Sequence, residues 1–338
     1  MNVLYQFNDK YAPYAGISIT SLFENNISED ITVWVLGEEI QEDNKAKLLK
    51  TAENYRQKII FIDDDQINRL INKMRKWDMP TYRGSYAANM RLFLPEVLPD
   101  SVARVLYLDA DTIVQGNIAS LYEMNFDGKA IAMVQDSLGE RHKSDLGFSK
   151  VDKYYNSGVI LFDMNVWKKL RLTERIIDHI KNERAQYPSP DQDLINVVCH
   201  RYIKCIGAEY NFQPIHSAYT DIQYFRYYGK TAYYSEEDIS IARNNIIILH
   251  CFRFIGEFPW DADNVHPFSE IFDEFSKLSL WCDYVKKNAN NGLLMKVEKI
   301  LYKILPRGTF LFIFSLSHNL FYKRANEMSV RKRISRIM

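Results

Sequence analysis

The sequence predicts an α/β fold built on one mostly parallel β-sheet with helices on both faces. Two observations predict it: short apolar segments alternate with helical segments from the first residues onward, and several apolar segments are almost uninterrupted. A strand that is apolar along its whole length suits a parallel sheet, because helices cover both faces of such a sheet. With 338 residues, the chain can form one large domain and an additional segment.

The expected elements follow one another at the spacing of strand–helix units. Strands are expected at residues 2–7, 30–37, 58–64, 102–109, 129–136, 157–164 and 244–252. Helices are expected at residues 14–26, 41–56, 84–99, 166–184 and 191–199. Because proline lacks a backbone N–H, it stops a helix or stands in its first turn. Pro95 and Pro99 therefore end the third helix, and Pro188 and Pro190 precede the fifth.

After residue 262 no strand pattern remains, so we place a domain boundary there and expect a helical extension over residues 263–338. Helices are expected at residues 266–288, 292–305 and 310–338. The extension ends in a basic tail with six cationic residues and only Glu327 opposing them: Lys323, Arg324, Arg331, Lys332, Arg333 and Arg336. An interfacial helix on an anionic membrane fits this pattern, and so does an apolar helix docked on the domain with a solvated end.

The charge and cysteine content exclude several classes of protein. Lys and Arg total 43, and Asp and Glu total 43, so nothing in the charge predicts a nucleic-acid partner. The four cysteines form no C-x-x-C pair, which argues against a structural zinc site and a disulfide framework. The N-terminus lacks a signal-peptide pattern, and no apolar run approaches the roughly 18 residues of a membrane span. We therefore expect a cytoplasmic location, with any membrane contact peripheral and on the inner face.

A pair of aspartates follows the apolar strand at residues 102–109. The stretch "VLYLDADTIV" places Asp109 and Asp111 on either side of Ala110 at the carboxyl end of this strand. In an open parallel sheet, ligands bind in the crevice at the carboxyl ends of the strands. Two carboxylates there could hold Mn²⁺ or Mg²⁺ against a diphosphate. They could equally cap a turn, because aspartate is common in turns.

A third interpretation of the pair is a phosphatase of the haloacid-dehalogenase class, in which Asp109 would be the nucleophile and Asp111 the acid. That class also needs a later lysine and a paired acid at another strand end. No apolar strand that ends in two aspartates follows Asp111, and the "FIDDD" stretch at residues 61–65 precedes it. The order of the motifs therefore disfavours a phosphatase.

Other polar side chains accompany the aspartates at the expected strand ends. Asn8, Asp9 and Tyr11 follow the first strand, where an amide or carboxylate can bind a pyrimidine edge and a tyrosine can cover its face. His250 follows the late strand and could be a third ligand for Mn²⁺. A histidine after a buried strand is also common in a purely structural role.

Six stretches together resemble the glycosyltransferases of family 8, the group of glycogenin and the bacterial lipooligosaccharide galactosyltransferases. They are "NDKY", "NMRLFLPEVLP", "VLYLDADTIV", "YYNSGVILFDMNVW", "DQDLIN" and "HCFRFIGEFPW", in the order of that family. The resemblance covers roughly residues 1–262. It implies a single Rossmann-like nucleotide-sugar domain of the GT-A type, a UDP-hexose donor, Mn²⁺ and retention of the anomeric configuration. The acceptor would be a surface glycan: a polysaccharide, a lipooligosaccharide or the glycan of a glycoprotein.

The resemblance also implies roles for individual residues. Around the nucleotide, Asn8, Asp9 and Tyr11 would hold the uracil, Arg91 would reach the donor sugar or its phosphates, and Ala110 and Gly256 would line the donor site. Asp109, Asp111 and His250 would bind the metal. At the reacting centre, Asn156 would lie beside the donor sugar, Asp191 would bind its hydroxyls and Gln192 would face the anomeric carbon. A carboxamide is a poor nucleophile, so we expect front-face attack rather than double displacement.

The late motif departs from the family at one position. The family usually carries lysine directly before Pro-Trp, where it binds the β-phosphate, but this chain has Phe258 before Pro259 and Trp260. Arg253 could replace the lysine, although its spacing differs. The departure leaves open a second interpretation, in which the protein binds a nucleotide sugar or a partner protein with weak or no catalysis.

Overall fold

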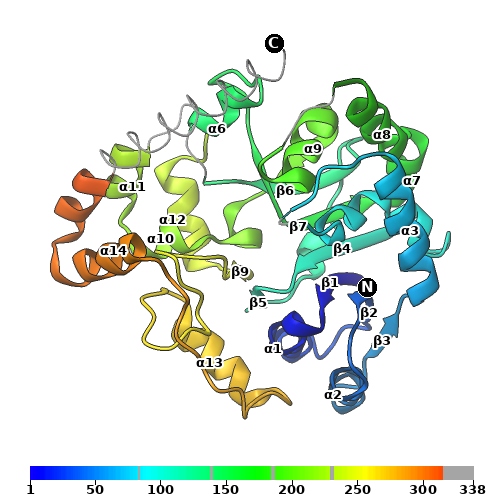
Figure 1. Ribbon diagram of the computed structural model, residues 1–338, viewed down its shortest axis with the longest axis horizontal. Helices are drawn as coiled ribbons and strands as arrows, with labels where there is room; N and C mark the ends of the chain where they lie inside the picture. Colours follow the sequence, from blue (N-terminus) through cyan, green and yellow to red (C-terminus); the bar gives the residue numbers. More distant parts are fainter. Residues whose placement is uncertain (83, 138–139, 184–186, 229–231, 315–338) are drawn as a thin grey trace.

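The computed structural model describes residues 1–82, 84–137, 140–183, 187–228 and 232–314 (Figure 1). Strands and helices alternate through the first half of this range, as the sequence predicts. Helices occupy both sides of a central sheet in Figure 1. The arrangement is the mixed, mostly parallel α/β fold that the sequence predicts.

The central sheet has seven strands in the order β3-β2-β1-β4-β7-β6-β8. Strands β1 to β4 run parallel, β7 runs antiparallel to both of its neighbours, and β8 is parallel to β6. The strand bounds are β1 Asn2–Asn8, β2 Thr32–Glu38, β3 Lys58–Phe61, β4 Arg104–Asp109, β6 Ile131–Gln135, β7 Tyr155–Asp163 and β8 Ile203–Cys205. Because β7 is antiparallel to β4, the start of β7 lies beside the end of β4.

A second, two-stranded sheet joins distant parts of the chain. It pairs β5 (Thr112–Val114) with β9 (Ile248–His250) in antiparallel register, and Thr112 lies opposite His250. The sequence predicts β9 but not β5, which is only three residues long and begins directly after Asp111. The pairing brings the end of the late strand to the Asp109–Asp111 turn.

Two apolar cores lie on the two faces of the central sheet, and β4 contributes to both. Its residues alternate: Leu106 and Leu108 belong to the core that contains α1, and Val105 and Tyr107 belong to the core that contains α8 and α9. All four side chains are fully buried. This double burial explains why the strand is apolar along its whole length.

The helices cover the sheet and predominate in the second half of the chain. The α-helices are α1 Ala12–Glu24, α2 Glu42–Asn54, α3 Asp64–Lys76, α4 Leu94–Val97, α5 Ala119–Tyr122, α6 Glu140–Asp145, α7 Met164–Lys169, α8 Leu172–Glu183, α9 Pro190–Cys199, α10 Pro214–Ala218, α11 Asp221–Tyr228, α12 Glu236–Asn244, α13 Ser269–Leu278 and α14 Leu293–Ile304. Short 3-10 helices are η1 Asp9–Tyr11, η2 Ala87–Phe93, η3 His200–Tyr202 and η4 Ala208–Asn211.

Three of the helices expected from the sequence differ in the structure. The segment 84–99 is the 3-10 helix η2 followed by α4, because Pro95 fits only the first turn of a new helix. The segment 166–184 is two helices, α7 and α8, separated at Arg171, whose φ of 53° is left-handed. The segment 266–288 is helical only from Ser269 to Leu278.

The segment after residue 262 packs against the rest of the chain. Helix α13 lies against α1 (Figure 1), and Phe268, Phe272 and Trp281 belong to the core on that face. A Cβ on Gly16 of α1 would lie 2.0 Å from the Trp281 ring, so glycine is needed for this contact. The boundary at residue 262 stays a prediction. Residues 307–314 are helical, and the basic tail from Lys323 lies outside the described residues.

Candidate active site

Most of the predicted site residues lie at one edge of the central sheet. Asp109 ends β4, Asn156 stands near the start of β7, and His250 ends β9. Asp191 and Gln192 lie in the first turn of α9, which packs against β7. The pairing of β4 with β7 and of β5 with β9 brings these segments together, although they are up to about 140 residues apart in sequence.

Asp109, Asp111 and His250 form one compact group. A ligand atom of each residue lies within 4.8 Å of the other two. His250 Nε2 lies 3.4 Å from Asp111 Oδ1 and 3.8 Å from Asp109 Oδ2. The turn is held by backbone contacts, because the Cys251 N–H donates to the Asp111 carbonyl at 2.7 Å and the Thr112 hydroxyl donates to the Asp109 carbonyl at 2.9 Å. Two carboxylates and an imidazole could hold Mn²⁺ or Mg²⁺.

The charges in this group stabilise one another. Burial alone raises the pKa of Asp111, but His250 outweighs it and holds that pKa below the usual value. Burial lowers the pKa of His250, and the charges of Asp111 and Asp109 outweigh it and raise that pKa. In the absence of a metal, the positive charge of His250 therefore offsets the negative charges of Asp109 and Asp111.

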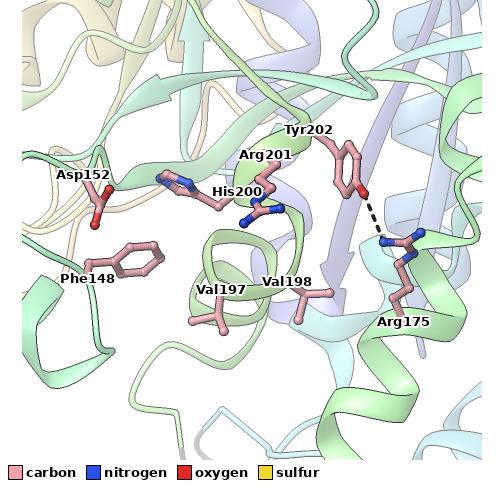
Figure 2. Close-up of a pocket in the computed structure, with 8 residues that line it drawn as sticks. All are labelled: Phe148, Asp152, Arg175, Val197, Val198, His200, Arg201 and Tyr202. Carbon is pink, nitrogen blue, oxygen red and sulfur yellow. Dashed lines mark hydrogen bonds between the residues drawn. The ribbon is translucent and has the colours of Figure 1, made fainter.

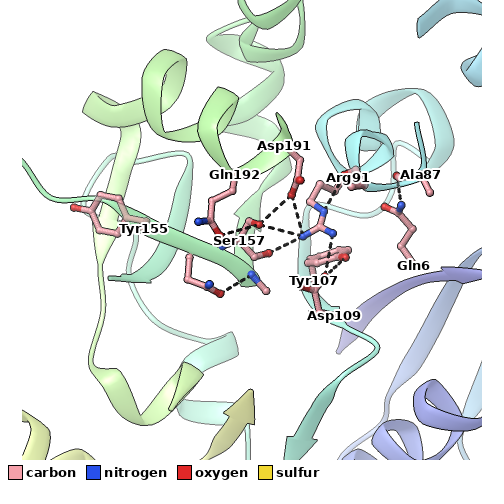
Figure 3. A network of polar contacts seen from close by, with 12 residues as sticks. Gln6, Ala87, Arg91, Tyr107, Asp109, Tyr155, Ser157, Asp191 and Gln192 are labelled. Carbon is pink, nitrogen blue, oxygen red and sulfur yellow. Dashed lines mark hydrogen bonds and ion pairs between the residues drawn. The ribbon is translucent and has the colours of Figure 1, made fainter. Parts of the chain in front are cut away.

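Arg91 joins the aspartate pair to Asp191 (Figure 3). Its Nη2 lies 3.0 Å from Asp109 Oδ1, and its Nη1 lies 3.4 Å from Asp191 Oδ2 and donates to the Ser157 carbonyl at 2.8 Å. The guanidinium lies over the Tyr107 ring at 4.0 Å. Burial lowers the pKa of Arg91, but Asp109, Tyr107 and Asp191 together outweigh it and raise that pKa, so the residue stays charged. Burial raises the pKa of Asp191, against the opposing charge of Arg91.

Gln192 is held by hydrogen bonds on both sides of its amide. Its Oε1 accepts from the Ser157 backbone N–H at 3.0 Å, and its Nε2 donates to the Tyr154 hydroxyl at 3.0 Å and to Asp136 Oδ2 at 3.2 Å. Asn156 Nδ2 donates to the same Asp136 oxygen at 2.8 Å. The amide of Gln192 is therefore fixed in one orientation by the chain itself.

Sequence reasoning missed four residues of this network: Asp136, Tyr154, Ser157 and Asn211. Of these, Asp136 was the easiest to predict from the sequence. It ends the strand expected at 129–136, and a carboxylate at the end of a strand often belongs to a ligand site. Asn211 carries no such signal, since it lies in a 3-10 turn with no periodic pattern. Only tertiary contacts reveal it.

The residues at the end of β1 line a separate part of the same sheet edge. A cavity of about 660 Å³ opens there, and its lining includes Asn8, Asp9, Glu38 and Tyr86. Asp9 Oδ1 accepts from the Gln41 N–H and from the Asn44 amide, both at 2.8 Å, so this carboxylate orders the loop before α2. Asn8 Oδ1 accepts from the Tyr11 N–H at 3.3 Å, which leaves its Nδ2 as a donor for a ligand.

Two remaining features of the late motif have structural roles. Gly256 has a φ of +76°, and a Cβ there would lie 2.9 Å from Met295 Sδ on α14. The Phe258 ring stacks on Trp260 at 4.4 Å, and the Arg253 guanidinium lies over the Phe258 ring at 5.1 Å. Trp260 in turn stacks on Tyr14 at 4.1 Å. Phe258 therefore links the Arg253 guanidinium to the Trp260 and Tyr14 rings.

A second cavity lies elsewhere and contains none of the predicted site residues. It measures about 450 Å³ and lies between α8, α9 and η3 (Figure 2). Its lining is Phe148, Asp152, Arg175, Val197, Val198, His200, Arg201 and Tyr202. Arg175 donates to the Tyr202 hydroxyl at 3.0 Å across one side of it. We place the chemistry at the Asp109–Gln192 edge, where the titratable side chains converge.

Comparison with known proteins shows which family the chain resembles. The model of glycosyl transferase family 8 matches residues 2–264. General stress protein A of Bacillus subtilis is 24% identical over 83% of this chain and 94% of that protein. Lipopolysaccharide 1,2-glucosyltransferase of Escherichia coli K12 is 28% identical over 62% of each chain.

Solved structures show the same fold. The galactosyltransferase LgtC, solved with donor and acceptor sugar analogues, superposes with a TM-score of 0.64 at 22% identity, over 83% of this chain and 96% of that one. The bifunctional glycosyltransferase WbbM gives a TM-score of 0.68 at 19% identity, over 83% of this chain and 50% of that one. Since the family model matches most of its length, this chain belongs to glycosyl transferase family 8.

Proposed function

We propose that the protein is a retaining hexosyltransferase that moves galactose or glucose from a UDP-sugar to a hydroxyl of a surface glycan. One observation carries this proposal: Arg91 holds the Asp109 carboxylate of the aspartate–histidine group next to Asp191. The group proposed to bind the metal and the residue proposed to bind the sugar are therefore adjacent, as transfer from a nucleoside diphosphate sugar requires. Membership of family 8 makes the phosphatase interpretation untenable.

The aspartate–histidine group fits Mn²⁺ or Mg²⁺, because carboxylates suit both ions and imidazole suits Mn²⁺ as well. Asp109, Asp111 and His250 would hold the ion. When bound, it would neutralise the charge that develops on the departing diphosphate. The cavity beside Asn8 and Asp9 has room for the nucleoside, and the free Nδ2 of Asn8 can donate to a uracil carbonyl.

The hydrogen bonds of Gln192 support front-face attack. Its Oε1 already accepts the Ser157 N–H, so it is not a free nucleophile, and Asp191 is paired with Arg91. The bond between the anomeric carbon and the diphosphate oxygen would break with its electron pair on that oxygen. The acceptor hydroxyl would attack the same face and give its proton to the same oxygen. Asp191, Gln192 and Asn156 would position the sugar and stabilise its positive charge.

Arg253 is our candidate for the cation that the missing lysine would supply. It lies three residues after His250, and its guanidinium rests on the Phe258 ring. Among the described residues it has no carboxylate within ion-pair distance. It is therefore available to bind an anionic ligand. If it does not do so, the alternative is a protein that binds UDP-sugar without turnover.

The name of a relative and the surface of α14 support a proposal for the acceptor and the cellular location. The Escherichia coli relative is named as acting on lipopolysaccharide, which supports a glycan acceptor that is lipid-linked or on a glycoprotein. In the described part of the chain, no helix has the length and apolar character to cross a membrane. Helix α14 instead exposes a one-sided apolar stripe, with Leu293, Val297, Ile300 and Ile304 spaced along one face. We propose a cytoplasmic enzyme with peripheral contact to the inner face of the membrane.

The decisive experiment measures hydrolysis of UDP-galactose and UDP-glucose with and without Mn²⁺. We expect slow, Mn²⁺-dependent release of UDP that is lost in Asp111→Ala and retained in the control Asp100→Ala, whose side chain is 98% exposed. UDP-sugar binding without hydrolysis or transfer would support the non-catalytic alternative. A covalent sugar on Gln192 or Asp191, detected by mass spectrometry, would contradict front-face attack.

A further inference from the structure

The buried Asn211 side chain lies between the metal group and the sugar group. It stands at the end of η4, and its Oδ1 is 3.0 Å from His250 Nδ1. Its Nδ2 donates to Asn156 Oδ1 at 2.8 Å. Asn156 in turn donates to Asp136, which also accepts from Gln192. A continuous line of hydrogen bonds therefore runs from His250 to Gln192.

The direction of this line is set by a backbone group. The Gly158 N–H can only donate, and it donates to the Asn156 side chain at 2.9 Å, so the atom it meets must be the amide oxygen of Asn156. The Asn211 atom that faces the same oxygen must then be its NH₂. The opposite end of Asn211, toward His250, is consequently an acceptor.

An acceptor opposite Nδ1 requires the proton of the neutral imidazole to be on Nδ1. The lone pair is then on Nε2, the nitrogen that lies 3.4 Å from Asp111 Oδ1. Gly158 contributes in a second way, because a Cβ there would lie 2.1 Å from His250 Cε1. The glycine therefore both starts the hydrogen-bond line and leaves space for the ring.

We propose that Asn211 is a positioning residue that sets the tautomer and orientation of His250 and couples the metal group to Asn156 and Gln192. Partners of this kind, behind a metal-binding histidine, fix the ring and raise metal affinity. The inference rests on the proposed metal role of His250. Its structural part, the tautomer, can be measured without any metal.

The first test is ¹⁵N NMR of the metal-free, full-length protein labelled at histidine, at a pH above the histidine titration range. The His250 resonances are identified by their absence in His250→Gln. We expect Nδ1 to keep its proton in the wild type, although Asp111 and Asp109 compete for the proton at Nε2. In Asn211→Leu, which cannot accept at Nδ1, the proton should lie on Nε2, where Asp111 accepts it. A wild-type His250 with the proton on Nε2 would overturn the proposal.

The second test measures Mn²⁺ binding by the EPR signal of free Mn²⁺, with and without UDP. We expect Asn211→Leu to weaken Mn²⁺ binding by roughly 10- to 100-fold. Asn211→Asp keeps the acceptor for His250 but loses the donor to Asn156. It should bind Mn²⁺ at the wild-type level or more tightly, while its kcat at saturating Mn²⁺ falls. A normal Mn²⁺ affinity with a lower kcat would separate the effect of Asn211 on His250 from its effect on Asn156 and Gln192.

The matched control is Asn26→Leu, which also removes a buried asparagine amide. Asn26 accepts from the Ile118 N–H and donates to the Leu22 carbonyl, both at 2.9 Å, and contacts no site residue. It should lose stability without a change in the His250 tautomer or in Mn²⁺ affinity. Wild-type tautomer and affinity in Asn211→Leu would refute the role of Asn211. Failure of the wild type to bind Mn²⁺ in either condition would refute the proposed function, while the NMR result would still decide the hydrogen-bond line.

Discussion

Arg91 and Asp109 form an ion pair between a buried arginine and a partly buried aspartate, with Nη2 of the arginine 3.0 Å from Oδ1 of the aspartate. The resemblance to family 8 led us to expect Arg91 to reach the donor. In the structure its guanidinium is already used within the protein, by Asp109, Asp191 and the Ser157 carbonyl. Arg91 therefore supports both carboxylates, and its contact with the donor stays a prediction.

Removing this arginine should destabilise the protein. Arg91→Met leaves the Asp109 and Asp191 carboxylates without their shared cation, and breaking a buried pair in this way costs about 3–5 kcal/mol of unfolding free energy. Arg91→Lys keeps the charge but loses the fork that spans both carboxylates, so its loss should be smaller. Urea denaturation measures both. A loss below about 1 kcal/mol in Arg91→Met, the range of a surface pair, would show that the pair is not important for stability.

Adding one methyl group at Gly158 should disable the metal group. The Cβ of Gly158→Ala would overlap the His250 ring, so the ring must move away from Asp111. Mutation of a residue that supports a metal ligand typically lowers activity roughly 10- to 100-fold. We expect Mn²⁺-dependent hydrolysis of the UDP-sugar to fall by at least this factor. Gly292→Ala is the matched control, because a Cβ there meets nothing within 4 Å. Equal activity of the two variants would contradict the geometry.

Arg253 and Phe258 should act as a pair in binding the diphosphate. Arg253→Met removes the cation, and Phe258→Leu removes the ring on which the guanidinium rests. We expect both variants to weaken UDP binding, measured by calorimetry, with the larger effect in Arg253→Met and little further loss in the double variant. Phe258→Lys in the Arg253→Met background should restore part of the affinity. Unchanged UDP affinity in Arg253→Met would contradict the proposal that Arg253 binds the diphosphate in place of the missing lysine.

His266 should make the protein less stable in acid. Burial lowers its pKa from 6.5 to about 4, and its ring must stay neutral because Nδ1 accepts from the Phe268 N–H while Nε2 donates to the Phe252 carbonyl. The unfolded chain takes up a proton below pH 6.5, whereas the folded chain does so only near pH 4. Unfolding free energy should therefore fall as the pH drops from 6.5 to 4, by about 3 kcal/mol at most.

The contribution of His266 can be isolated with His266→Gln, whose amide can donate and accept at similar places but does not titrate. Urea denaturation at several pH values should show a shallower loss of stability in this variant than in the wild type over that interval. Above pH 6.5 the difference between the two proteins should be constant. Parallel profiles at all pH values would mean that His266 does not titrate differently in the folded state.

The exposed stripe of α14 should contribute to membrane binding. Val297 and Ile300 are 44% and 54% exposed on that stripe, so charged replacements leave the core intact. We expect the full-length Val297→Glu/Ile300→Glu variant to co-sediment less with vesicles that contain anionic lipid. Ile27→Glu changes an exposed apolar residue in the turn after α1 and should behave as wild type. Equal co-sedimentation of the two variants would exclude α14 from the contact.

The sequence by itself determined the strand–helix order, the mostly parallel sheet and the family. These are local properties: an apolar strand such as 104–109 is buried on both faces, and its pattern shows this without knowledge of its neighbours. The sequence also identified Asp109, Asp111 and His250, because two acids at a strand end and a histidine at another carry their own signal. Its errors concerned helix bounds, where Arg171 and Pro95 divide segments that look continuous.

Only the tertiary structure decided how these residues work together. Pairing of Thr112 with His250 depends on a contact between segments about 140 residues apart, which no local pattern encodes. The same holds for Asn211, whose role appears only when its amide lies between His250 and Asn156. Chain topology and side-chain packing set these distances, whereas the sequence pattern sets only which face of an element is buried.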